Sequence, residues 1–347
     1  MKSDFILMSG PCSVESEEQV FNTAKQLKEL VDPNYFRAGL WKPRTRPGSF
    51  EGVGMQGIPW LKRIQSELKL SIVVEVGCAN HVETILKNSI NAYWIGARTV
   101  SNPFSVQEII NSTDNKEIDI FIKNPVFPDV ELWTGVIERY LNAGFKHIFA
   151  IHRGFYPYEK TILRNIPMWE IPIELSRRFP EIKIICDPSH ISGKVEYIQE
   201  ISQQAINLNM SGLMIESHEN PQCALSDKNQ QITPKRLKEI LSELNFKSEN
   251  SNNISYELNL EKIRKKVDIV DYKLIDILEN RFNLTDEIGK LKKEHNITTL
   301  QLERWKSIVE SRLKYSEKHN LSKDFLLKTL ELIHKESIDR QNKIIND

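Results

Sequence analysis

The sequence predicts an eight-stranded (β/α)8 barrel followed by a separate all-helical domain. Up to about residue 245, short apolar runs alternate with amphipathic segments, and after that point the pattern is helical throughout. All 15 prolines lie at or before Pro234, and 13 of the 14 glycines lie at or before Gly212. Proline and glycine mark turns, so their disappearance indicates a change of architecture. We expect a barrel over residues 1–245, a polar linker over 246–256 and a helical domain over 257–347.

Eight β-rich runs are spread over the first part of the chain. Most are continuous apolar runs, typical of parallel strands that are buried on both faces. Segments long enough for a helix separate them, such as Glu17–Leu30, Trp60–Leu68 and Val195–Leu208. This alternation matches a (β/α)8 barrel in number and size. The alternative is an open doubly wound sheet, but no G-x-G-x-x-G motif of a dinucleotide-binding sheet follows the first run. The runs are Phe5–Ser9, Tyr35–Leu40, Ser71–Val76, Ala92–Gly96, Ile118–Ile122, His147–Ile151, Ile182–Cys186 and Gly212–Ile215.

The helical part carries one long apolar stripe. No glycine or proline interrupts the segment from Glu257 to Ile288, which predicts a helix of about 35 residues and about 50 Å. Such a helix is longer than usual in a globular protein, so we expect its stripe to pack against a second chain in an intertwined homodimer. Two shorter helices are expected over 302–318 and 323–346. The stripe consists of Leu260, Ile263, Val267, Val270, Leu274, Ile277 and Leu278.

Composition and charge narrow the class of protein. Lys and Arg number 47 and Asp and Glu number 47, so the chain lacks the electrostatic signature of a protein that binds nucleic acid or an anionic membrane. No apolar run approaches the roughly 20 residues that span a bilayer, and the N-terminus lacks the pattern of a signal peptide. We therefore expect a cytoplasmic protein with reduced thiols. The chain has four cysteines: Cys12, Cys78, Cys186 and Cys223. Their spacing is not that of a disulfide framework or of a structural zinc site.

Charged residues stand at or just after the ends of the expected strands. In a (β/α)8 barrel the active site lies at the C-terminal ends of the strands, so these side chains are expected to converge. Guanidinium and ammonium groups gathered there suit substrates that carry several phosphate and carboxylate groups. The cations of this set are Arg37, Lys42, Arg44, Arg98, Lys123 and Arg153.

A second set at the strand ends combines one sulfur, one nitrogen and two carboxylate ligands: Cys12, His190, Glu216 and Asp227. These ligand types predict a site for a divalent transition metal, such as manganese, iron, cobalt or zinc, rather than for magnesium or calcium. His218 is the alternative imidazole, and we prefer His190 for its Asp-Pro-Ser-His context. The alternative for Cys12 is a small buried apolar side chain.

Five motifs, in this order, resemble those of 3-deoxy-D-arabino-heptulosonate 7-phosphate (DAHP) synthase, more narrowly its short-barrel class. The motifs are Gly10-Pro11-Cys12-Ser13, Lys42-Pro43-Arg44-Thr45, Ile95-Gly96-Ala97-Arg98, Asp187-Pro188-Ser189-His190 and Ala224-Leu225-Ser226-Asp227. The resemblance implies condensation of phosphoenolpyruvate with erythrose 4-phosphate, the first step of aromatic amino-acid biosynthesis. Relatives that make an eight-carbon sugar acid carry K-A-N-R-S in place of the second motif, which favours the seven-carbon product.

The same resemblance implies a role for each residue. The family's metal ligands match Cys12, His190, Glu216 and Asp227. The residues that hold phosphoenolpyruvate match Lys42, Arg98, Lys123 and Arg153, and a carboxylate near the reacting water matches Glu75. Arg44 and Thr45 match the family's residues on the erythrose 4-phosphate side of the site, and Arg37 is expected to line the same pocket. The chain departs from the family's frequent K-R-G after the fifth run, where Lys123 is followed by Asn124 and Pro125.

Six residues along the three expected helices are Arg264, Arg281, Lys292, Arg304, Ser337 and Gln341. Their order and spacing, from about Leu258 to Gln341, resemble the all-helical chorismate mutase domain. This resemblance implies the pericyclic rearrangement of chorismate to prephenate. It also implies that Arg264 comes from the partner chain, that Arg281 and Arg304 bind the two carboxylates with support from Ser337, and that Lys292 and Gln341 face the ether oxygen.

Two positions depart from the mutase pattern. Many relatives have Asp where Gln301 stands and Glu where Trp305 stands, and those acids contact the substrate hydroxyl. The alternative is therefore that the helical domain serves the synthase only as a sensor and dimerisation module. Prephenate is a dianion suited to the arginines of this domain, so we expect it to inhibit the synthase through the mutase site.

Overall fold

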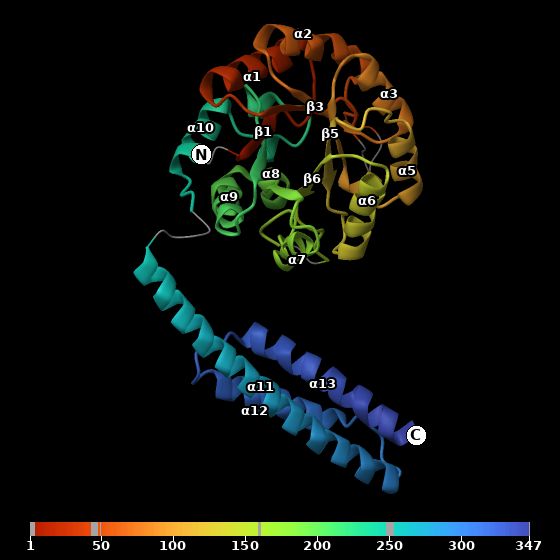
Figure 1. Cartoon of the computed structure of the whole chain (residues 1–347), viewed down its shortest axis with the longest axis vertical. Helices are drawn as coiled ribbons and strands as arrows, with labels where there is room; N and C mark the ends of the chain where they lie inside the picture. Colours follow the sequence, from red (N-terminus) through yellow and green to blue (C-terminus); the bar gives the residue numbers. More distant parts are fainter. Residues whose placement is uncertain (1–3, 43–47, 49, 159–160, 248–252, 347) are drawn as a thin grey trace. The chain divides into compact units, whose positions relative to one another are not determined.

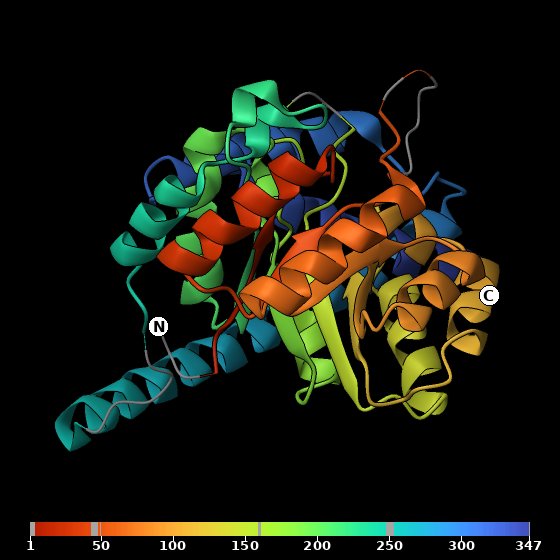
Figure 2. The same ribbon diagram turned by 90° about the horizontal axis from the view of Figure 1, so that it is seen from above.

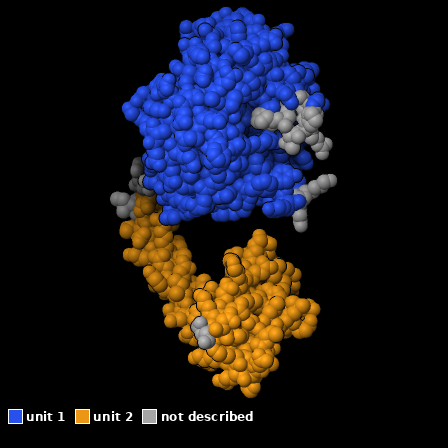
Figure 3. Space-filling view, turned by 90° about the vertical axis from the view of Figure 1, so that its right-hand side faces the viewer, with its two compact units in different colours: residues 1–249 blue, residues 250–347 orange. Residues whose placement is uncertain are grey.

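A computed structural model describes residues 4–42, 48, 50–158, 161–247 and 253–346 of the chain. The chain divides into two compact units, residues 1–249 and residues 250–347, which Figure 3 distinguishes by colour. The first unit combines strands and helices, and the described part of the second unit contains helices alone. None of the described helices combines the length and the apolar character needed to span a bilayer.

Eight parallel strands of the first unit close into a barrel in sequence order, with β8 hydrogen-bonded to β1. Figure 1 shows the strands at the centre of this unit with its helices around them. The predicted (β/α)8 barrel is therefore confirmed and the open sheet is excluded. The strands are β1 (Ile6–Gly10), β2 (Tyr35–Ala38), β3 (Ile72–Val76), β4 (Ala92–Ile95), β5 (Asp119–Lys123), β6 (His147–His152), β7 (Lys183–Cys186) and β8 (Gly212–Glu216).

Both faces of the strands are packed, which explains why the strands are continuous apolar runs in the sequence. Side chains alternate between the faces. On β1, Leu7 belongs to the core under the helices, whereas Met8 belongs to the core inside the barrel. The interior core consists of Ile6, Met8, Val73, Ala92, Trp94, Phe121, Ile151, Ile185 and Met214.

Side-chain caps mark the starts of several of the covering helices. The Ser16 hydroxyl accepts a hydrogen bond from the Gln19 N–H at the start of α1, and Asp129 and Thr233 cap α6 and α10 in the same way. Each cap satisfies an N–H group that has no partner within the helix. The helices of this unit are α1 (Glu17–Leu30), α2 (Ile58–Leu68), α3 (Ala79–Lys87), α4 (Ala97–Val100), α5 (Pro103–Asn111), α6 (Val130–Asn142), α7 (Glu170–Arg178), α8 (Pro188–Ser192), α9 (Ile198–Asn207) and α10 (Pro234–Glu243). Shorter 3-10 turns are η1 (Gly54–Gly57), η2 (Val195–Tyr197), η3 (Pro221–Cys223) and η4 (Lys228–Gln230).

The helices of the second unit are α11 (Ile254–Glu294), α12 (Leu302–Ser316) and α13 (Lys323–Asn346). With 41 residues, α11 is about 60 Å long at 1.5 Å per residue; it is the long teal helix in Figure 2. It begins three residues before the expected Glu257, because the Asn253 side chain caps it by accepting a hydrogen bond from the Tyr256 N–H.

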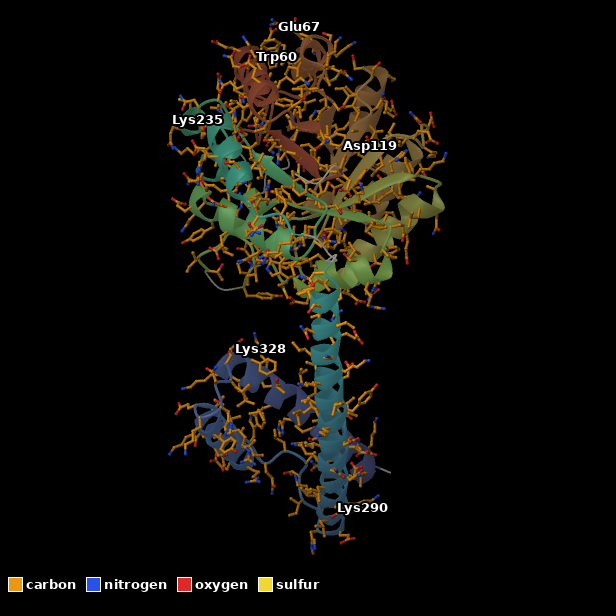
Figure 4. The ribbon with its side chains drawn as sticks, turned by 60° about the vertical axis from the view of Figure 1, so that its left-hand side comes forward. Trp60, Glu67, Asp119, Lys235, Lys290 and Lys328 are labelled. Carbon is orange, nitrogen blue, oxygen red and sulfur yellow. The ribbon has the colours of Figure 1, made fainter. Side chains whose placement is uncertain are left out.

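Only the second half of α11 is packed within this unit. There it contacts α13, which also contacts α12, and an Asp286–Arg340 ion pair joins α11 to α13. In the first half every residue from 261 to 277 is exposed, including Ile263 at 59% and Ile277 at 63%. Figure 4 shows side chains on all sides of this half, while α12 and α13 lie beside the half that carries the labelled Lys290. Most of the apolar stripe is thus exposed in the single chain.

Candidate active sites

The charged residues of the barrel continue the inward-facing rows of its interior core. Side chains two positions apart on a strand share a face, so a charged residue two positions after an interior apolar residue also faces inward. The interior therefore changes from apolar to charged at the C-terminal ends of the strands, where a (β/α)8 barrel places its active site. Within the strands the successive residues are Val73 and Glu75, Phe121 and Lys123, and Met214 and Glu216. Arg153 and Asp187 directly follow the ends of β6 and β7, two positions after the interior residues Ile151 and Ile185.

Two buried ion pairs lie at this end of the barrel. Arg37 Nη2 lies 3.0 Å from Glu216 Oε1, and Lys123 Nζ lies 2.9 Å from Asp187 Oδ2. Burial alone would raise the pKa of both carboxyls. For Glu216 the charge of Arg37 outweighs burial, and for Asp187 the charges of His190 and then Lys123 do so, which holds both pKa values below their usual range. Both carboxyls are therefore ionised at neutral pH.

The four candidate metal ligands approach one another in two pairs. Cys12 Sγ lies 3.3 Å from Asp227 Oδ2, and His190 Nε2 lies 3.8 Å from Glu216 Oε1. Burial, followed by the charge of Glu216, raises the pKa of the Cys12 thiol to about 12, so the thiol donates to the carboxylate. Among the described residues, no three His, Cys, Asp or Glu side chains are arranged as a ready metal site. In ligand type, one sulfur, one imidazole and two carboxylates fit a divalent transition metal.

Asp187 orients the candidate imidazole ligand. Its Oδ1 accepts a hydrogen bond from the His190 backbone N–H at 3.1 Å, and its Oδ2 lies 2.8 Å from His190 Nδ1. This arrangement leaves Nε2 as the ring nitrogen nearer to Glu216. The Nε2 atom of the alternative imidazole, His218, lies 3.8 Å from Glu15, which is not a candidate ligand. His190 thus lies beside another candidate ligand, Glu216.

Lys42 and Glu75 lie near these buried groups. Lys42 Nζ donates a hydrogen bond to the Cys12 carbonyl at 2.8 Å. Burial alone would lower the pKa of Lys42, but the acidic groups of Cys12 and Glu75 outweigh burial and raise it. Glu75 lies against Gly96, where an added Cβ would come within 2.1 Å of Glu75 Oε1. Glycine at this position therefore makes room for the carboxylate.

In addition to burial, two other cations, Arg164 and Arg98, affect the pKa of Arg153. Burial first, and then the charge of Arg164, lower the pKa of Arg153 to about 10, and Arg98 adds to this effect. Such repulsion among guanidinium groups is relieved when an anion binds near them. The remaining two candidates, Arg44 and Thr45, lie outside the described residues.

Loop residues that the sequence did not single out support the candidate ligands. Arg164 Nη1 donates hydrogen bonds to Asp227 Oδ1 at 3.2 Å and to Gln230 Oε1 at 2.5 Å. Gln230 Nε2 in turn donates to Glu216 Oε2 at 2.7 Å. Neither residue stands at the end of a strand, so no spacing in the sequence signals this role.

The second unit contains a cavity of about 550 Å³ lined by all three of its described helices. Five of the six candidate mutase residues line it. The sixth, Arg264, lies on the exposed first half of α11 and does not. Four cations line the cavity, and no described Asp or Glu does. The lining residues are Arg281, Leu284, Thr285, Ile288, Lys292, Thr299, Gln301, Arg304, Trp305, Ile308, Arg312, Leu330, His334, Ser337, Ile338 and Gln341.

Hydrogen bonds orient the polar groups of this cavity. Arg281 Nη1 donates to Ser337 Oγ at 2.7 Å, and Lys292 Nζ donates to a backbone carbonyl at 2.6 Å. Gln341 Nε2 donates to the Ser337 carbonyl at 3.2 Å, and its buried Oε1 has no hydrogen-bond partner among the described residues. Burial lowers the pKa of Lys292, and burial followed by the charge of Arg312 lowers the pKa of Arg281. Positive charge without a neighbouring carboxylate suits a dianionic ligand.

Both residues that depart from the mutase pattern, Gln301 and Trp305, belong to the lining of this cavity. Trp305 stacks on His334, with ring centroids 4.0 Å apart and an interplanar angle of 13°. Burial first, and then the charges of Arg281 and Lys292, lower the pKa of His334, so its imidazole is neutral at neutral pH. Gln301 is the N-cap residue of α12 but makes no side-chain capping bond. At the two positions where many relatives have acids, the cavity is therefore lined by the amide of Gln301 and by Trp305, which stacks on a neutral imidazole.

Comparison with known proteins gives a result for each unit. The model of the DAHP synthetase I family matches residues 2–251, which is more than half of the chain. The chain belongs to the DAHP synthetase I family. The chorismate mutase type II model matches residues 263–342. The chain thus joins a DAHP synthase domain to a chorismate mutase domain.

Two curated relatives and two solved structures are each similar to 69% of this chain. Phospho-2-dehydro-3-deoxyheptonate aldolase of Thermotoga maritima is 28% identical over 240 residues, which is 69% of each chain. 2-Dehydro-3-deoxyphosphooctonate aldolase of Desulfotalea psychrophila is 26% identical over 264 residues, or 69% of this chain and 88% of the other. The crystal structure of the Thermotoga maritima DAHP synthase has a TM-score of 0.62 at 28% identity, covering 69% of this chain and 68% of the other. A truncated form of that synthase gives 0.60 at 25% identity, covering 69% and 84%.

Proposed function

We propose that the barrel condenses phosphoenolpyruvate with erythrose 4-phosphate to DAHP and phosphate, in the first step of aromatic amino-acid biosynthesis. The observation that carries this proposal is the group of buried cations at the C-terminal ends of the strands, beside one thiol, one imidazole and two carboxylates. This composition suits two anionic substrates that would repel one another in water. The protein is expected to work in the cytoplasm.

Cys12, His190, Glu216 and Asp227 would hold the divalent metal. When bound, manganese, iron, cobalt or zinc supplies a Lewis acid that makes the aldehyde carbon of erythrose 4-phosphate more electrophilic. Asp187 orients the imidazole of this set through its contact with His190 Nδ1. The buried thiol must lose its proton to serve as a ligand, so binding of the metal is expected to release that proton.

The cations position the reacting groups. Lys42, Arg98, Lys123 and Arg153 hold the phosphate and carboxylate of phosphoenolpyruvate, and Arg37 lies on the erythrose 4-phosphate side together with Arg44 and Thr45. The alkene carbon of phosphoenolpyruvate bonds to the aldehyde carbon. Water adds to the carbon that carries the phosphate, near Glu75, and inorganic phosphate then leaves. The protein's contribution is to hold two anions in reacting geometry and to stabilise the charge that develops.

The eight-carbon reaction is the second candidate, because the Desulfotalea psychrophila relative is a 2-dehydro-3-deoxyphosphooctonate aldolase. Phosphoenolpyruvate contributes three carbons, so that product requires a five-carbon aldose phosphate. The segment Lys42-Pro43-Arg44-Thr45 favours the four-carbon substrate. Side-by-side assays of phosphate release with both aldose phosphates decide between them, and preference for the five-carbon sugar would overturn this part of the proposal.

The helical unit rearranges chorismate to prephenate. The cationic cavity without a described carboxylate supports this proposal. Arg281, supported by Ser337, and Arg304 bind the two carboxylates, while Lys292 and Gln341 donate hydrogen bonds to the ether oxygen as its negative charge grows. The reaction needs neither a nucleophile nor a general base, so holding the compact conformer and stabilising that oxygen are sufficient.

The exposed stripe of α11 supports an intertwined homodimer, in which Arg264 would enter the mutase site of the partner chain. The alternative is that the helical unit acts only as a sensor and dimerisation module. Chorismate absorbs in the ultraviolet, and its disappearance with purified protein distinguishes the two. An unchanged absorbance, in a preparation that consumes phosphoenolpyruvate, would favour the sensor alone. We also infer that prephenate bound in the cavity inhibits the synthase.

A further inference from the structure

Trp94 occupies the boundary between the apolar interior of the barrel and its charged end. It lies on β4, is fully buried and belongs to the interior core. In the strand register it pairs with Glu75 on β3 and with Phe121 on β5. One neighbour is therefore a candidate active-site carboxylate, and the other is an apolar side chain of the interior core.

The indole ring of Trp94 contacts both cations of the buried ion pairs. The guanidinium carbon of Arg37 lies 5.1 Å from the ring centroid, and Lys123 Nζ lies 5.9 Å from it. Both distances are within the range of cation–π attraction, which is strongest for tryptophan and for desolvated cations. Arg37 and Lys123 are at most 5% exposed, so water screens this attraction little.

Hydrogen bonds and ion pairs from the described residues alone do not satisfy the buried guanidinium group of Arg37. Glu216 pairs with one end of the guanidinium, but Arg37 Nε and Nη1 are buried without a hydrogen-bond partner among the described residues. The positive charges of Arg37 and Lys123 also repel each other, and this repulsion contributes to the lowered pKa of Lys123 after the larger effect of burial. An aromatic ring beside both cations stabilises them without neutralising them.

Trp133 shows what a purely structural tryptophan looks like in this barrel. It is also fully buried, on α6, and its indole N–H donates to the Ile122 carbonyl at 3.2 Å. No cation of the described residues lies over its ring. The Trp94 N–H, by contrast, has no partner among the described residues, so this indole does not serve to anchor the backbone.

We propose that Trp94 is a positioning residue of the synthase site, whose indole ring holds Arg37 and Lys123 where they meet the anionic groups of the two substrates. The inference rests on the proposed function, in which Lys123 contacts phosphoenolpyruvate and Arg37 lies on the erythrose 4-phosphate side. One ring then sets the spacing between cations that serve different substrates. Its loss affects the binding of both substrates.

The test compares Trp94→Phe and Trp94→Leu with Trp133→Leu in the full chain loaded with manganese. Phenylalanine keeps a weaker aromatic face, and leucine removes it. We expect the dissociation constant for phosphoenolpyruvate, measured by calorimetry, to rise about threefold in Trp94→Phe and about tenfold or more in Trp94→Leu. The KM for erythrose 4-phosphate is expected to rise in the same order. Trp133→Leu is expected to lower the melting temperature and to leave both constants within about twofold.

Each result has a defined meaning. Unchanged substrate constants in Trp94→Leu would refute the inference. Equal losses in Trp94→Phe and Trp94→Leu would also refute it, because the aromatic face would then be irrelevant, and an equal loss in Trp133→Leu would show general loosening of the barrel instead. A wild-type protein that binds manganese but not phosphoenolpyruvate would overturn the proposed function itself, and this inference with it.

Discussion

Replacing His152 with leucine is expected to make the barrel less sensitive to acid. His152 is the last residue of β6 and is completely buried. Its ring lies among those of Phe155 and Trp169, at centroid distances of 5.8 and 5.2 Å. Burial lowers the pKa of His152 to about 3, with a smaller opposing effect from the Pro167 carbonyl and still smaller effects from the charges of Arg153 and Asp187.

The sign of the effect follows from proton linkage. An unfolded chain binds a proton at this histidine near pH 6.5, whereas the folded chain does not bind it until about pH 3. The unfolded state therefore holds more protons between these values, and the free energy of unfolding falls by about 1.4 kcal/mol per pH unit as the pH decreases. Integrated from pH 7.5 to pH 5, the loss amounts to about 2 kcal/mol.

Urea unfolding of wild type and His152→Leu at several pH values between 5 and 7.5 measures this difference. Leucine changes the packing, but that contribution does not depend on pH, so the slope of stability against pH is the informative quantity. The variant is expected to lose about 2 kcal/mol less than the wild type on acidification to pH 5. His147→Leu, at the exposed beginning of the same strand, is the matched control. Parallel curves for the wild type and His152→Leu would refute the reasoning.

Three further predictions concern the proposed reactions. Adding a chelator and substituting Cys12→Ala are each expected to abolish the condensation and to leave the mutase intact, because all four proposed ligands lie in the barrel. Equal loss of both activities would contradict this. Mixing Arg264→Ala with Arg281→Ala protein is expected to restore part of the mutase activity through heterodimers, and the lack of recovery despite measured subunit exchange would count against a shared site. Prephenate is expected to slow the synthase in the wild type but not in Arg281→Ala, and full inhibition of that variant would place the sensor elsewhere.

The barrel was predictable from sequence because both faces of its strands are packed. A strand that is buried on both faces has no solvent-facing side, so it forms a nearly continuous apolar run in the sequence. The ends were less predictable. The second run was expected to extend to Leu40, but β2 ends at Ala38, since the next carbonyls serve loops instead. The carbonyl of Gly39 accepts from the Val14 N–H, and that of Leu40 accepts from the Gly54 N–H. Such long-range bonds leave no mark in the local sequence.

The candidate site was predictable where it follows strand geometry. Lys123 and Glu216 could be named because they stand at the ends of expected strands, and in the structure each lies two positions after an interior apolar residue and so faces the barrel axis. Arg164 and Gln230 could not, because they come from loops and reach Asp227 and Glu216 only after folding. Trp94 was missed for a different reason. In sequence it is one more apolar residue of a buried strand, and its role depends on the cations of two other strands.

In the helical unit, the resemblance identified the lining residues better than any pattern of charge. Charged residues lie on every side of these helices, and periodicity alone does not separate Arg281 from its neighbours. Arg312 and His334 were missed, although both line the cavity. Trp305 was expected to disturb recognition of a hydroxyl, and the structure adds its stacking partner, His334. A residue that departs from a family pattern therefore has to be interpreted together with its contacts.

Although the net charge of the chain is zero, its cations gather at two sites that are built differently. In the barrel, buried Arg37 and Lys123 are each paired with a carboxylate, because a buried cation without a counter-charge would be costly. The mutase cavity is more open to solvent, and its four cations have no carboxylate of the described residues beside them. Water can stabilise them until a dianion binds. Increasing ionic strength should therefore weaken chorismate binding more than phosphoenolpyruvate binding, since salt screens exposed charges more than buried pairs.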